Sequence, residues 1–325
     1  MKKLIAVILA LVLCCSVSFA LAEEKAAVTV GIAQFAVHGS LDNCREGFLQ
    51  GLAAGGYVEG ENLTVVYQNA QADMNLAVSI TGSFVSNNYD LICAIATPIA
   101  VSAVEAADGK IPVIYTAVSA PQESGLADEN KLGIGNVTGS SDLIPVTLQL
   151  QAIREMLPEA RNIGILYTVG EVNSQVQLAQ YQAAAPDYGF AIVDQSITVG
   201  ADIALALPTL LPQVDCLCML TDNTVVQFLD VVLDSADEAK IPVFGSEVEQ
   251  VAKGCVAAVG LDYVKLGYDT GLMAARVLDG EDAAQIPYLE VTESDVYYNS
   301  QVCEALGIVM PEALLTSATD MAAAE

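Results

Sequence analysis

The chain contains the tetrapeptide Lys-Ile-Pro-Val twice, at 110–113 and at 240–243, and each copy follows a similar succession of segments. Apolar strand-like runs at 28–35 and 91–96 precede the first copy, and runs at 163–167 and 216–220 precede the second. Continuous apolar runs of this length are typical of parallel strands buried on both faces. The duplication predicts two lobes of related construction that face each other across a cleft.

Helical spacing separates the predicted strands in both halves of the chain. In the first half, helices are expected at 42–55, 75–86 and 97–107, with strands at 28–35, 63–68, 91–96 and 111–116. In the second half, helices are expected at 145–156, 173–185, 201–211, 224–239 and 263–278, with strands at 163–167, 191–197, 216–220, 243–245 and 256–260. This alternation predicts an α/β fold with two Rossmann-like lobes and right-handed crossovers.

The first residues have the composition of an export signal. Lys2 and Lys3 precede an apolar core at 4–13, and Ala20-Leu21-Ala22 has the small-residue pattern of a cleavage site. The core is too short for a spanning helix, which needs about 20 apolar residues. We therefore expect a signal peptide at 1–22 and an extracytoplasmic location. Processing at Cys14 or Cys15 to give a lipid-anchored protein is the alternative.

The charge balance argues against nucleic acid and anionic membranes as partners. The sequence has 40 acidic residues against 12 lysines and arginines, which gives a formal net charge of −28. Polyanions repel such a surface. Because the acids are spread along the chain, they predict a solvated and soluble surface. We expect a monomer.

The cysteines do not have the spacing of a metal site. Cys93, Cys216 and Cys218 lie inside apolar strand-like runs, where cysteine behaves as a small hydrophobic residue. Two cysteines at i and i+2 of one strand point to the same face, which is poor zinc-site spacing. We expect no metal and no cofactor. The sequence leaves open whether the thiols are free or form disulfides.

Six loops follow the predicted strands and are rich in hydroxyl, amide and carboxylate groups. Ligands of open α/β sheets bind beyond the carboxyl ends of the strands, and here that rule selects 34–42, 96–98, 116–119, 167–174, 221–223 and 245–247. The candidate ligand-binding residues in these loops are Gln34, Phe35, His38, Thr97, Thr116, Ser119, Tyr167, Glu171, Asn173, Ser174, Thr221, Asp222, Asn223, Ser246 and Glu247.

Two of these loops suit the two charged ends of an amino acid. Thr97, with the free N–H groups of the helix that follows it, suits a carboxylate. Asp222, flanked by Thr221 and Asn223, suits an ammonium group, and Glu247 is a second candidate for that role. Thr97 and Asp222 are equally well placed to cap their helices.

The remaining candidates are less specific. Phe35 and Tyr167, each at the end of a strand, either stack on an aromatic ligand or pack their lobes. His38 is the single histidine, and it either contacts the ligand or lines its loop. The chain has no G-x-S-x-G, G-x-x-x-x-G-K-[ST] or H-E-x-x-H motif. We therefore expect a binding protein and not an enzyme.

Distinctive strings occur along nearly the whole mature chain. They lie at 28–35, 45–60, 67–71 (Tyr-Gln-Asn-Ala-Gln), 94–98, 136–139 (Asn-Val-Thr-Gly), 141–143 (Ser-Asp-Leu), 164–167 (Gly-Ile-Leu-Tyr), 170–174, 221–225 and 241–246. Together they resemble the ABC-transporter substrate-binding proteins related to TrpX-type aromatic amino-acid binders. The resemblance implies a type I periplasmic-binding fold with three interlobe crossovers. It also implies that Thr97, Ser119, Asn173, Ser174 and Asp222 lie near the ligand.

From the residues and the resemblance we expect a first lobe at 26–138 plus 261–285, a second lobe at 139–260 plus 286–318, and a frayed tail at 319–325. The expected function is that of an extracytoplasmic solute-binding protein of an ABC importer. It would clamp a small zwitterion, an aromatic or branched amino acid, and present it to a membrane permease. The alternatives are a sensor that feeds a membrane receptor and a hydrolase on the same fold.

Overall fold

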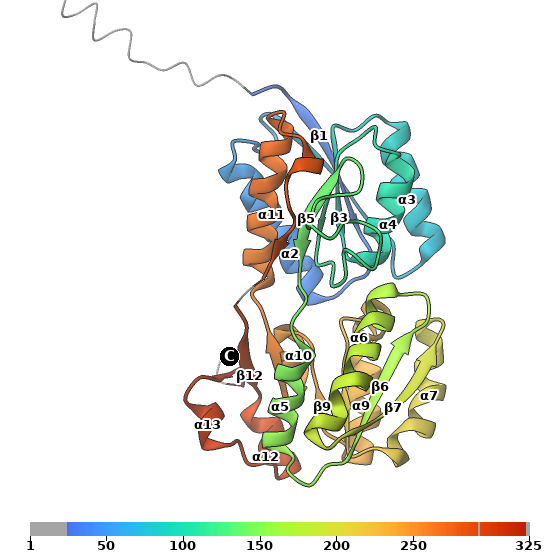
Figure 1. Cartoon of the computed structure of the whole chain (residues 1–325), viewed down its shortest axis with the longest axis vertical. Helices are drawn as coiled ribbons and strands as arrows, with labels where there is room; N and C mark the ends of the chain where they lie inside the picture. Colours follow the sequence, from blue (N-terminus) through green and yellow to red (C-terminus); the bar gives the residue numbers. More distant parts are fainter. Residues whose placement is uncertain (1–24, 292, 323–325) are drawn as a thin grey trace, which may run out of the picture.

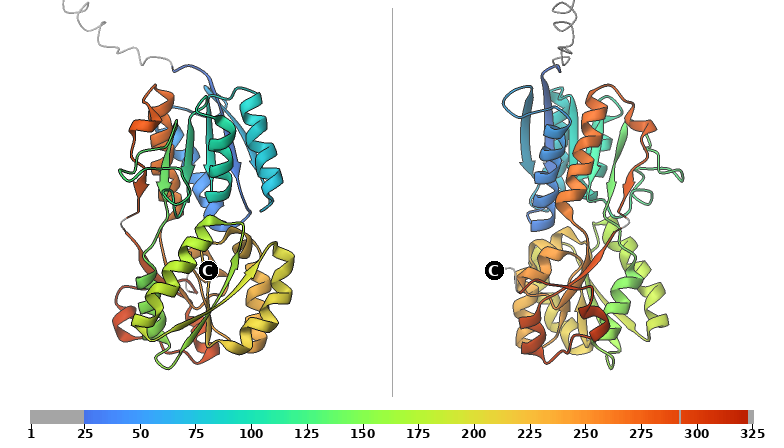
Figure 2. Two further views of the ribbon diagram at one scale, coloured as in Figure 1. Left: turned by 45° about the vertical axis from the view of Figure 1, so that its right-hand side comes forward. Right: turned by 90° about the vertical axis from the view of Figure 1, so that its left-hand side faces the viewer.

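The computed structural model describes residues 25–291 and 293–322, so the predicted signal peptide at 1–22 lies outside the described residues. The described chain forms two α/β lobes that are stacked end to end (Figure 1). Within this part, the chain passes between the lobes after β5, after β10 and after β11, and these crossings lie side by side in both views of Figure 2. The two-lobe α/β prediction is confirmed.

The N-terminal lobe is built on a six-stranded sheet whose neighbouring strands are all parallel. Its order is β11(Leu289–Glu290), β5(Val137–Ser141), β4(Val113–Thr116), β3(Leu91–Ile95), β1(Val28–Gln34) and β2(Leu63–Asn69). The helices α2(Gly39–Ala54) and α11(Tyr263–Leu278) cover one face of this sheet, and α3(Met74–Ser86) and α4(Thr97–Ala107) cover the other (Figure 1). Parallel strands covered on both faces need apolar side chains on both sides.

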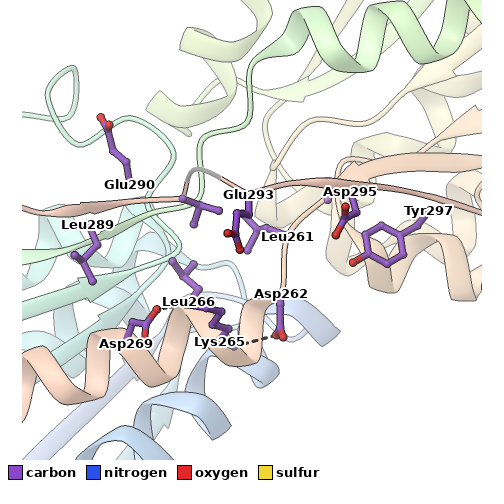
Figure 3. A pocket seen from close by; sticks show the side chains of 12 residues that line it. Leu261, Asp262, Lys265, Leu266, Asp269, Leu289, Glu290, Glu293, Asp295 and Tyr297 are labelled. Atoms are coloured by element: carbon purple, nitrogen blue, oxygen red, sulfur yellow. Dashed lines mark hydrogen bonds and ion pairs between the residues drawn. The ribbon is translucent and has the colours of Figure 1, made fainter. Parts of the chain in front are cut away.

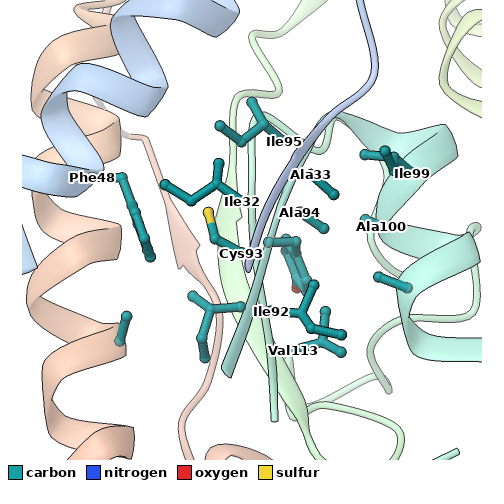
Figure 4. Packing of buried hydrophobic residues seen from close by; sticks show 14 of the residues in the cluster. Ile32, Ala33, Phe48, Ile92, Cys93, Ala94, Ile95, Ile99, Ala100 and Val113 are labelled. Carbon is teal, nitrogen blue, oxygen red and sulfur yellow. The ribbon is translucent and has the colours of Figure 1, made fainter. Parts of the chain in front are cut away.

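The core of this lobe shows that requirement directly. Ile32 and Cys93 lie on the side of the sheet that faces α2, where Phe48 packs, while Ile99 packs on the opposite face (Figure 4). Every residue of β3 is buried. Burial of a large apolar side chain contributes about 1.5–3 kcal/mol. The apolar runs that marked the strands in the sequence therefore also provide the cohesion of the lobe.

The C-terminal lobe has a parallel sheet of β7(Ala191–Ile197), β6(Asn162–Thr168), β8(Cys216–Cys218) and β9(Val243–Phe244). Its helices are α5(Val146–Met156), α6(Val172–Ala184), α7(Ile203–Leu210), α8(Asn223–Gln227), α9(Leu229–Ala239) and α10(Val248–Lys253), and short 3-10 turns lie at η1(Ala185–Tyr188), η2(Gly200–Asp202) and η3(Leu211–Gln213). One apolar cluster includes side chains of α5 and α6 and another those of α7 and α9, as expected for a doubly covered sheet.

A second small sheet completes this lobe. It contains β10(Ala257–Gly260), β12(Asp295–Tyr298) and β13(Thr319–Asp320), and the segments η4(Ala283–Gln285), α12(Ser300–Leu306) and α13(Glu312–Leu315) accompany the C-terminal part of the chain. Tyr297 pairs with Thr319 in parallel register. The prediction of a frayed tail from 319 is therefore wrong for the two residues of β13. The prediction rested on the alanine-rich composition of the tail, which does not reveal that Thr319 and Asp320 pair with β12.

The expected lobe boundaries also need correction. The first lobe was predicted to end at 138 and to resume only at 261–285, yet β5 runs to Ser141 in the N-terminal sheet and β11 adds Leu289–Glu290 to its edge.

The helix predicted at 224–239 is two helices, because Phe228 leaves the helical conformation at φ −107° and ψ 25°. The Phe228 ring packs against Gly200, where a Cβ atom would lie 2.0 Å from Cε2 of that ring.

Candidate functional site

Several of the predicted loops meet where the two lobes face each other. Hydrogen bonds cross the interface between Ser119 Oγ and Thr221 Oγ1 at 2.8 Å and between Ser40 Oγ and Glu247 Oε2 at 2.5 Å. The amide of Val37 adds a third, to the side chain of Gln227 at 3.0 Å. Helix α4 of the first lobe also lies against α6 of the second (Figures 1 and 2). The lobes are therefore closed on each other at the carboxyl ends of their strands.

One chain of hydrogen bonds across this interface has a determined direction. Gln177 Nε2 donates to Thr221 Oγ1 at 2.6 Å, while the Thr221 amide donates to Gln177 Oε1 at 3.0 Å. Ser119 Oγ donates to Asp142 Oδ1 at 2.8 Å. The Ser119 hydroxyl hydrogen is thus already used, so Thr221 donates its own hydrogen to Ser119. The chain runs from the second lobe into the first and ends on a carboxylate.

That carboxylate, Asp142, is a buried acid that accepts hydrogen bonds from neutral groups. It is 4% exposed and accepts from Ser119 and from Tyr263 Oη, the latter at 3.1 Å. Burial raises the pKa of Asp142, while its two hydroxyl partners act in the opposite direction. Among the ion pairs of the described residues, none involves Asp142. A buried carboxylate is strongly stabilised when a cation meets it.

Asp222, the predicted ammonium partner, has a different environment. Its carboxylate accepts hydrogen bonds from the amide and the hydroxyl of Thr168, at 2.6 and 2.8 Å, and from the Val225 amide at 2.9 Å. The last of these caps α8. Asp222 is fully buried, and these partners all belong to its own lobe. Its oxygens are therefore committed to holding β6 against the start of α8.

Glu171 is engaged in the same way. Its two oxygens accept from the amides of Asn223 and Thr224, at 3.0 and 2.9 Å, and from both of their side chains. Burial, followed by the charge of Asp222, raises the pKa of Glu171 to about 7. The two acids thus fix the loop that carries Thr221. They position this loop for contact with the first lobe.

Two buried polar atoms at the interface have no hydrogen-bond partner among the described residues. The first is Asn173 Oδ1, although Nδ2 of the same side chain donates to the Thr221 carbonyl at 2.7 Å. Because Nδ2 must face that carbonyl, the free atom is the acceptor end of the amide. The second is His38 Nδ1, which lies 3.6 Å from Glu247 Oε2. Burial lowers the pKa of His38 to about 4, so its ring is neutral near pH 7.

The start of α4 provides donors on the opposite side of the interface. Thr97 opens this helix and is 2% exposed. The first N–H groups of a helix have no partner within it and favour anions. Ala96 precedes them with φ 89° and ψ 153°, a conformation that residues with a side chain rarely adopt. Such strain persists only where the surrounding structure maintains it, and here it orients the peptide that enters α4.

Most of the other predicted site residues make contacts within their own lobes, but Asn223 approaches His38 of the first lobe. Gln34 donates to the Ala36 carbonyl at 2.8 Å, and Ser246 donates to the Leu220 carbonyl at 2.9 Å. Phe35 is 2% exposed in the core of the first lobe. Thr116 accepts a hydrogen bond from Ser140, and Ser174 follows Asn173 in α6. Tyr167 lines a groove with Gln175 and Leu178 of α6. Asn223 Oδ1 lies 3.4 Å from His38 Nε2.

Several side chains of this interface were not among the predicted site residues: Ser40, Asn43, Asp142, Gln177, Gln227, Glu249 and Tyr263. Asp142 follows β5 directly, so the strand-end rule would have selected it if 137–141 had been identified as a strand. Ser40 and Tyr263 lie in the first turns of α2 and α11. Gln177 lies in α6. Ser40 lies in the selected loop 34–42 but was not chosen as a site residue, and nothing local in the sequence distinguishes Gln177 and Tyr263 from ordinary helical residues.

Two cavities lie near the interlobe crossings. One of about 30 Å³ joins Asp142, Thr221 and Ser246 with the apolar side chains of Ile144, Val146, Tyr181, Met219 and Val259. The other, of about 320 Å³, lies between α11 and the segment 289–297 (Figure 3). It is lined by Asp262, Lys265, Asp269, Glu290, Glu293 and Asp295 among others. None of the predicted site residues lines the second cavity.

The part of the chain that the structure describes shows three further features. Cys44, Cys93, Cys216, Cys218, Cys255 and Cys303 are all buried free thiols. No group of three or more His, Cys, Asp and Glu side chains in 25–291 and 293–322 is arranged to hold a metal ion. In the same ranges, no helix combines the length and the apolar character needed to cross a membrane.

Known proteins resemble this chain over most of its length. The "Tyrosine-binding protein" of Clostridioides difficile is 36% identical over 284 residues, which are 87% of this chain and 82% of that protein. A solved structure described as the ABC domain in complex with L-Trp from Streptococcus pneumonia is 30% identical, with a TM-score of 0.88 over 91% of this chain and 99% of that one.

A third relative was solved in another arrangement. The ligand-free, open structure of a substrate binding protein with adhesive properties from Clostridium difficile is 36% identical and has a TM-score of 0.67, over 90% of this chain and 99% of that one. The present structure is thus more similar to the L-Trp complex than to the open protein, although its sequence identity to the open protein is higher.

The family assignment rests on the fold, these relatives and a match to the whole packed chain. The neighbours share the type I periplasmic-binding fold that the resemblance implied. The model of the family described as "ABC transporter substrate binding protein" matches residues 29–322. The chain therefore belongs to the ABC transporter substrate-binding proteins.

Proposed function

We propose that this protein is exported, closes its two lobes around a zwitterionic amino acid with an aromatic side chain, and presents it to an ABC permease in the membrane. The observation that carries the proposal is Asp142, a buried carboxylate at the lobe interface with two hydroxyl donors and, among residues 25–291 and 293–322, no ion-pair partner. An ammonium group is the charge that this site lacks. His38 is neutral at pH 7 and does not supply that charge.

The two charged ends of the ligand have separate partners in this proposal. The ammonium group meets Asp142, and the unpartnered Asn173 Oδ1 is a second acceptor for its hydrogens. The carboxylate meets the first N–H groups of α4 and the hydroxyl of Thr97. Closing the lobes then completes the hydrogen bond between Ser119 and Thr221. The ligand stabilises the closed form because only that form holds both ends.

Asp222 and Glu171 have a supporting role in this proposal. Their oxygens accept from backbone amides and side chains of the second lobe, so they position Thr221 and Asn223. We place the ammonium group at Asp142 and not at Asp222, because the donors around Asp222 already satisfy its carboxylate.

The relatives and the surroundings of Asp142 support the proposal that the ligand has an aromatic side chain. One relative is named for tyrosine and another was solved with L-Trp. Beside Asp142 lie the apolar side chains of Ile144, Val146 and Met219. The two aromatic residues predicted to stack on the ligand make other contacts, Phe35 in the core and Tyr167 against α6. The ring of the ligand is therefore proposed to contact aliphatic surface.

Substitution of Asp142 by asparagine tests the ammonium site. We expect Asp142→Asn to lower the affinity for L-tryptophan about 30-fold or more, since loss of one partner of a buried charge pair costs about 2–5 kcal/mol of binding free energy. Binding of indole-3-propionate, which has no ammonium group, should change far less. Fluorescence titration is suitable because the protein has no tryptophan of its own.

Asp230→Asn is a suitable control for the loss of one negative charge, because the side chain of Asp230 is 81% exposed. Its affinities for both compounds should equal those of the wild type. If Asp142→Asn lost the same factor of affinity for L-tryptophan and for indole-3-propionate, the ammonium site at Asp142 would be contradicted. Failure of the wild type to bind L-tryptophan, L-tyrosine or L-phenylalanine would contradict the aromatic class.

A further inference from the structure

A single hydroxyl group lies between two carboxylates at the lobe interface. Ser40 Oγ, in α2 of the first lobe, is 2.5 Å from Glu247 Oε2 and 2.8 Å from Glu249 Oε2, both in the second lobe. Glu249 also accepts from Asn43 Nδ2, at 2.7 Å. Ser40 is fully buried and Glu247 is 3% exposed. All three oxygens of this bridge are thus brought together by closure of the lobes.

The number of hydrogens in the bridge is too small if both acids are ionised. A serine hydroxyl carries one hydrogen and donates to one acceptor, whereas an ionised carboxylate only accepts. One of the two short oxygen contacts would then have no hydrogen between its atoms. O–H···O hydrogen bonds are about 2.5–3.0 Å long, so both contacts of Ser40 Oγ, at 2.5 and 2.8 Å, have the length of bonded pairs and each needs a hydrogen.

We propose that closing the lobes takes up one proton, which Glu247 then holds and donates to Ser40. Ser40 in turn donates to Glu249, which also accepts from Asn43. In the open form Glu247 is no longer covered by Ser40, and its carboxyl group loses the proton to water. This inference rests on the closing movement that we propose and not on which ligand drives it.

The groups around Glu247 provide no positive charge that would replace the proton. His38 Nδ1 is 3.6 Å away but neutral, since burial lowers the pKa of His38 to about 4. Lys253 of α10 is paired with Asp230 at 3.7 Å. The other titratable or polar groups that face Glu247 or this cluster are neutral or negative: Asp42, Cys44, Asp142, Glu249, Gln250, Cys255 and Tyr263.

The pKa of Glu247 is consistent with this arrangement. Burial, together with the neighbouring charge of Glu249, raises the pKa of Glu247 to about 8 in the closed form, although Ser40 acts in the opposite direction. A solvated glutamate has a pKa of about 4.3. The bound proton therefore contributes its full stabilisation of the closed form below the pKa of the open form, about 4.3. This contribution decreases as the pH rises and is lost above the pKa of the closed form, about 8. Between them, affinity should fall by up to about tenfold per pH unit.

Calorimetry of L-tryptophan binding at pH 7, in two buffers with different heats of ionisation, tests the proton count. We expect the wild type to take up about one proton and to bind more than tenfold more weakly at pH 8 than at pH 6. Glu247→Gln supplies an amide donor in place of the protonated acid. Proton uptake on binding should therefore vanish in this variant, and its affinity for L-tryptophan should vary little with pH. Glu129→Gln, at an exposed residue, is the matched control and should behave as the wild type.

A second experiment separates the bridge from the identity of the ligand. The hydroxyl oxygens of Ser119 and Thr221 are 2.8 Å apart across the interface, so the Ser119→Cys/Thr221→Cys pair should form a disulfide that holds the lobes closed without a solute. In the locked protein, ¹³C NMR of glutamate carboxyl groups should show one group that titrates near pH 8 and is absent after Glu247→Gln. Titration of the Glu247 carboxyl group below about pH 5 in the locked protein would overturn the proposal, whether or not L-tryptophan binds.

Discussion

Two buried aspartates follow strands near the lobe interface, and their neighbours give them different roles. Asp222 accepts from two backbone amides and a hydroxyl inside its own lobe, whereas Asp142 accepts from two hydroxyls, one of them on β4's loop and one on α11. Amides of the chain stay in place when the lobes move, so Asp222 is satisfied in any arrangement. Asp142 has capacity left for a ligand.

Asparagine at position 222 should therefore affect stability more than binding. Asp222→Asn directs an N–H group toward the amides of Thr168 or Val225, and an unsatisfied buried group costs about 1–3 kcal/mol. Urea unfolding should show this loss relative to the wild type. The folded variant should bind L-tryptophan within about threefold of the wild type. Unchanged stability together with a large loss of affinity would return the ammonium role to Asp222.

At the scale of elements, the pairing of α2 with α11 returns the chain to the first lobe after its excursion into the second. The two helices lie side by side (Figure 1). They approach closely because glycines of each helix face the backbone of the other. A Cβ atom on Gly47 would lie 2.0 Å from the carbonyl oxygen of Val264, and one on Gly271 would lie 2.2 Å from that of Phe48. Backbone atoms cannot move aside as a flexible side chain can.

Alanine at either position should force the helices apart. We expect Gly47→Ala to lower the free energy of unfolding by about 1–3 kcal/mol, the usual cost of overpacking. Gly82→Ala in α3 is the control, because a Cβ atom there meets nothing within 4 Å. That change should stabilise the protein by about 0.4–1 kcal/mol. If both variants melted alike, the close packing of α2 and α11 would not explain the glycine.

At the scale of the whole molecule, the interlobe hydrogen bonds exist only while the lobes are closed. The chain from Gln177 through Thr221 and Ser119 to Asp142 spans both lobes. The TM-score is 0.88 with the L-Trp complex and 0.67 with the ligand-free open relative, so this arrangement is more similar to that of the complex. Contacts of this kind contribute to ligand affinity and not to the stability of the open protein.

Removal of the Thr221 hydroxyl tests this distinction. Thr221→Val should weaken L-tryptophan about fivefold, since a neutral hydrogen bond contributes about 0.5–1.5 kcal/mol. Its melting temperature without ligand should stay within about one degree of the wild type. Thr198→Val, at an exposed position outside the interface, is the matched control and should change neither quantity. A lower melting temperature without ligand, together with unchanged affinity, would show that this hydroxyl serves the second lobe through Gln177 and not the closed form.

Local pattern predicted much of the architecture. The helices 97–107 and 263–278 and the strand 191–197 have the predicted bounds, because each is marked by its own periodicity or its own stop signal. Helix α8 is capped by Asp222, as its position allowed. The strand 137–141 was not among the predicted strands, since Val-Thr-Gly-Ser-Ser has little apolar character, and its burial depends on β4 and β11 beside it.

The sequence by itself determined the two α/β lobes, the polar loops at the strand ends and the family, because these follow from local periodicity and contiguous strings. Only the tertiary structure decided which polar groups satisfy one another. Asp142, Ser40, Gln177 and Tyr263 come from four separate segments, and their roles depend on partners from the other lobe or from α11. A buried carboxylate is a structural anchor or a ligand site according to the donors around it, and distant parts of the chain supply those donors.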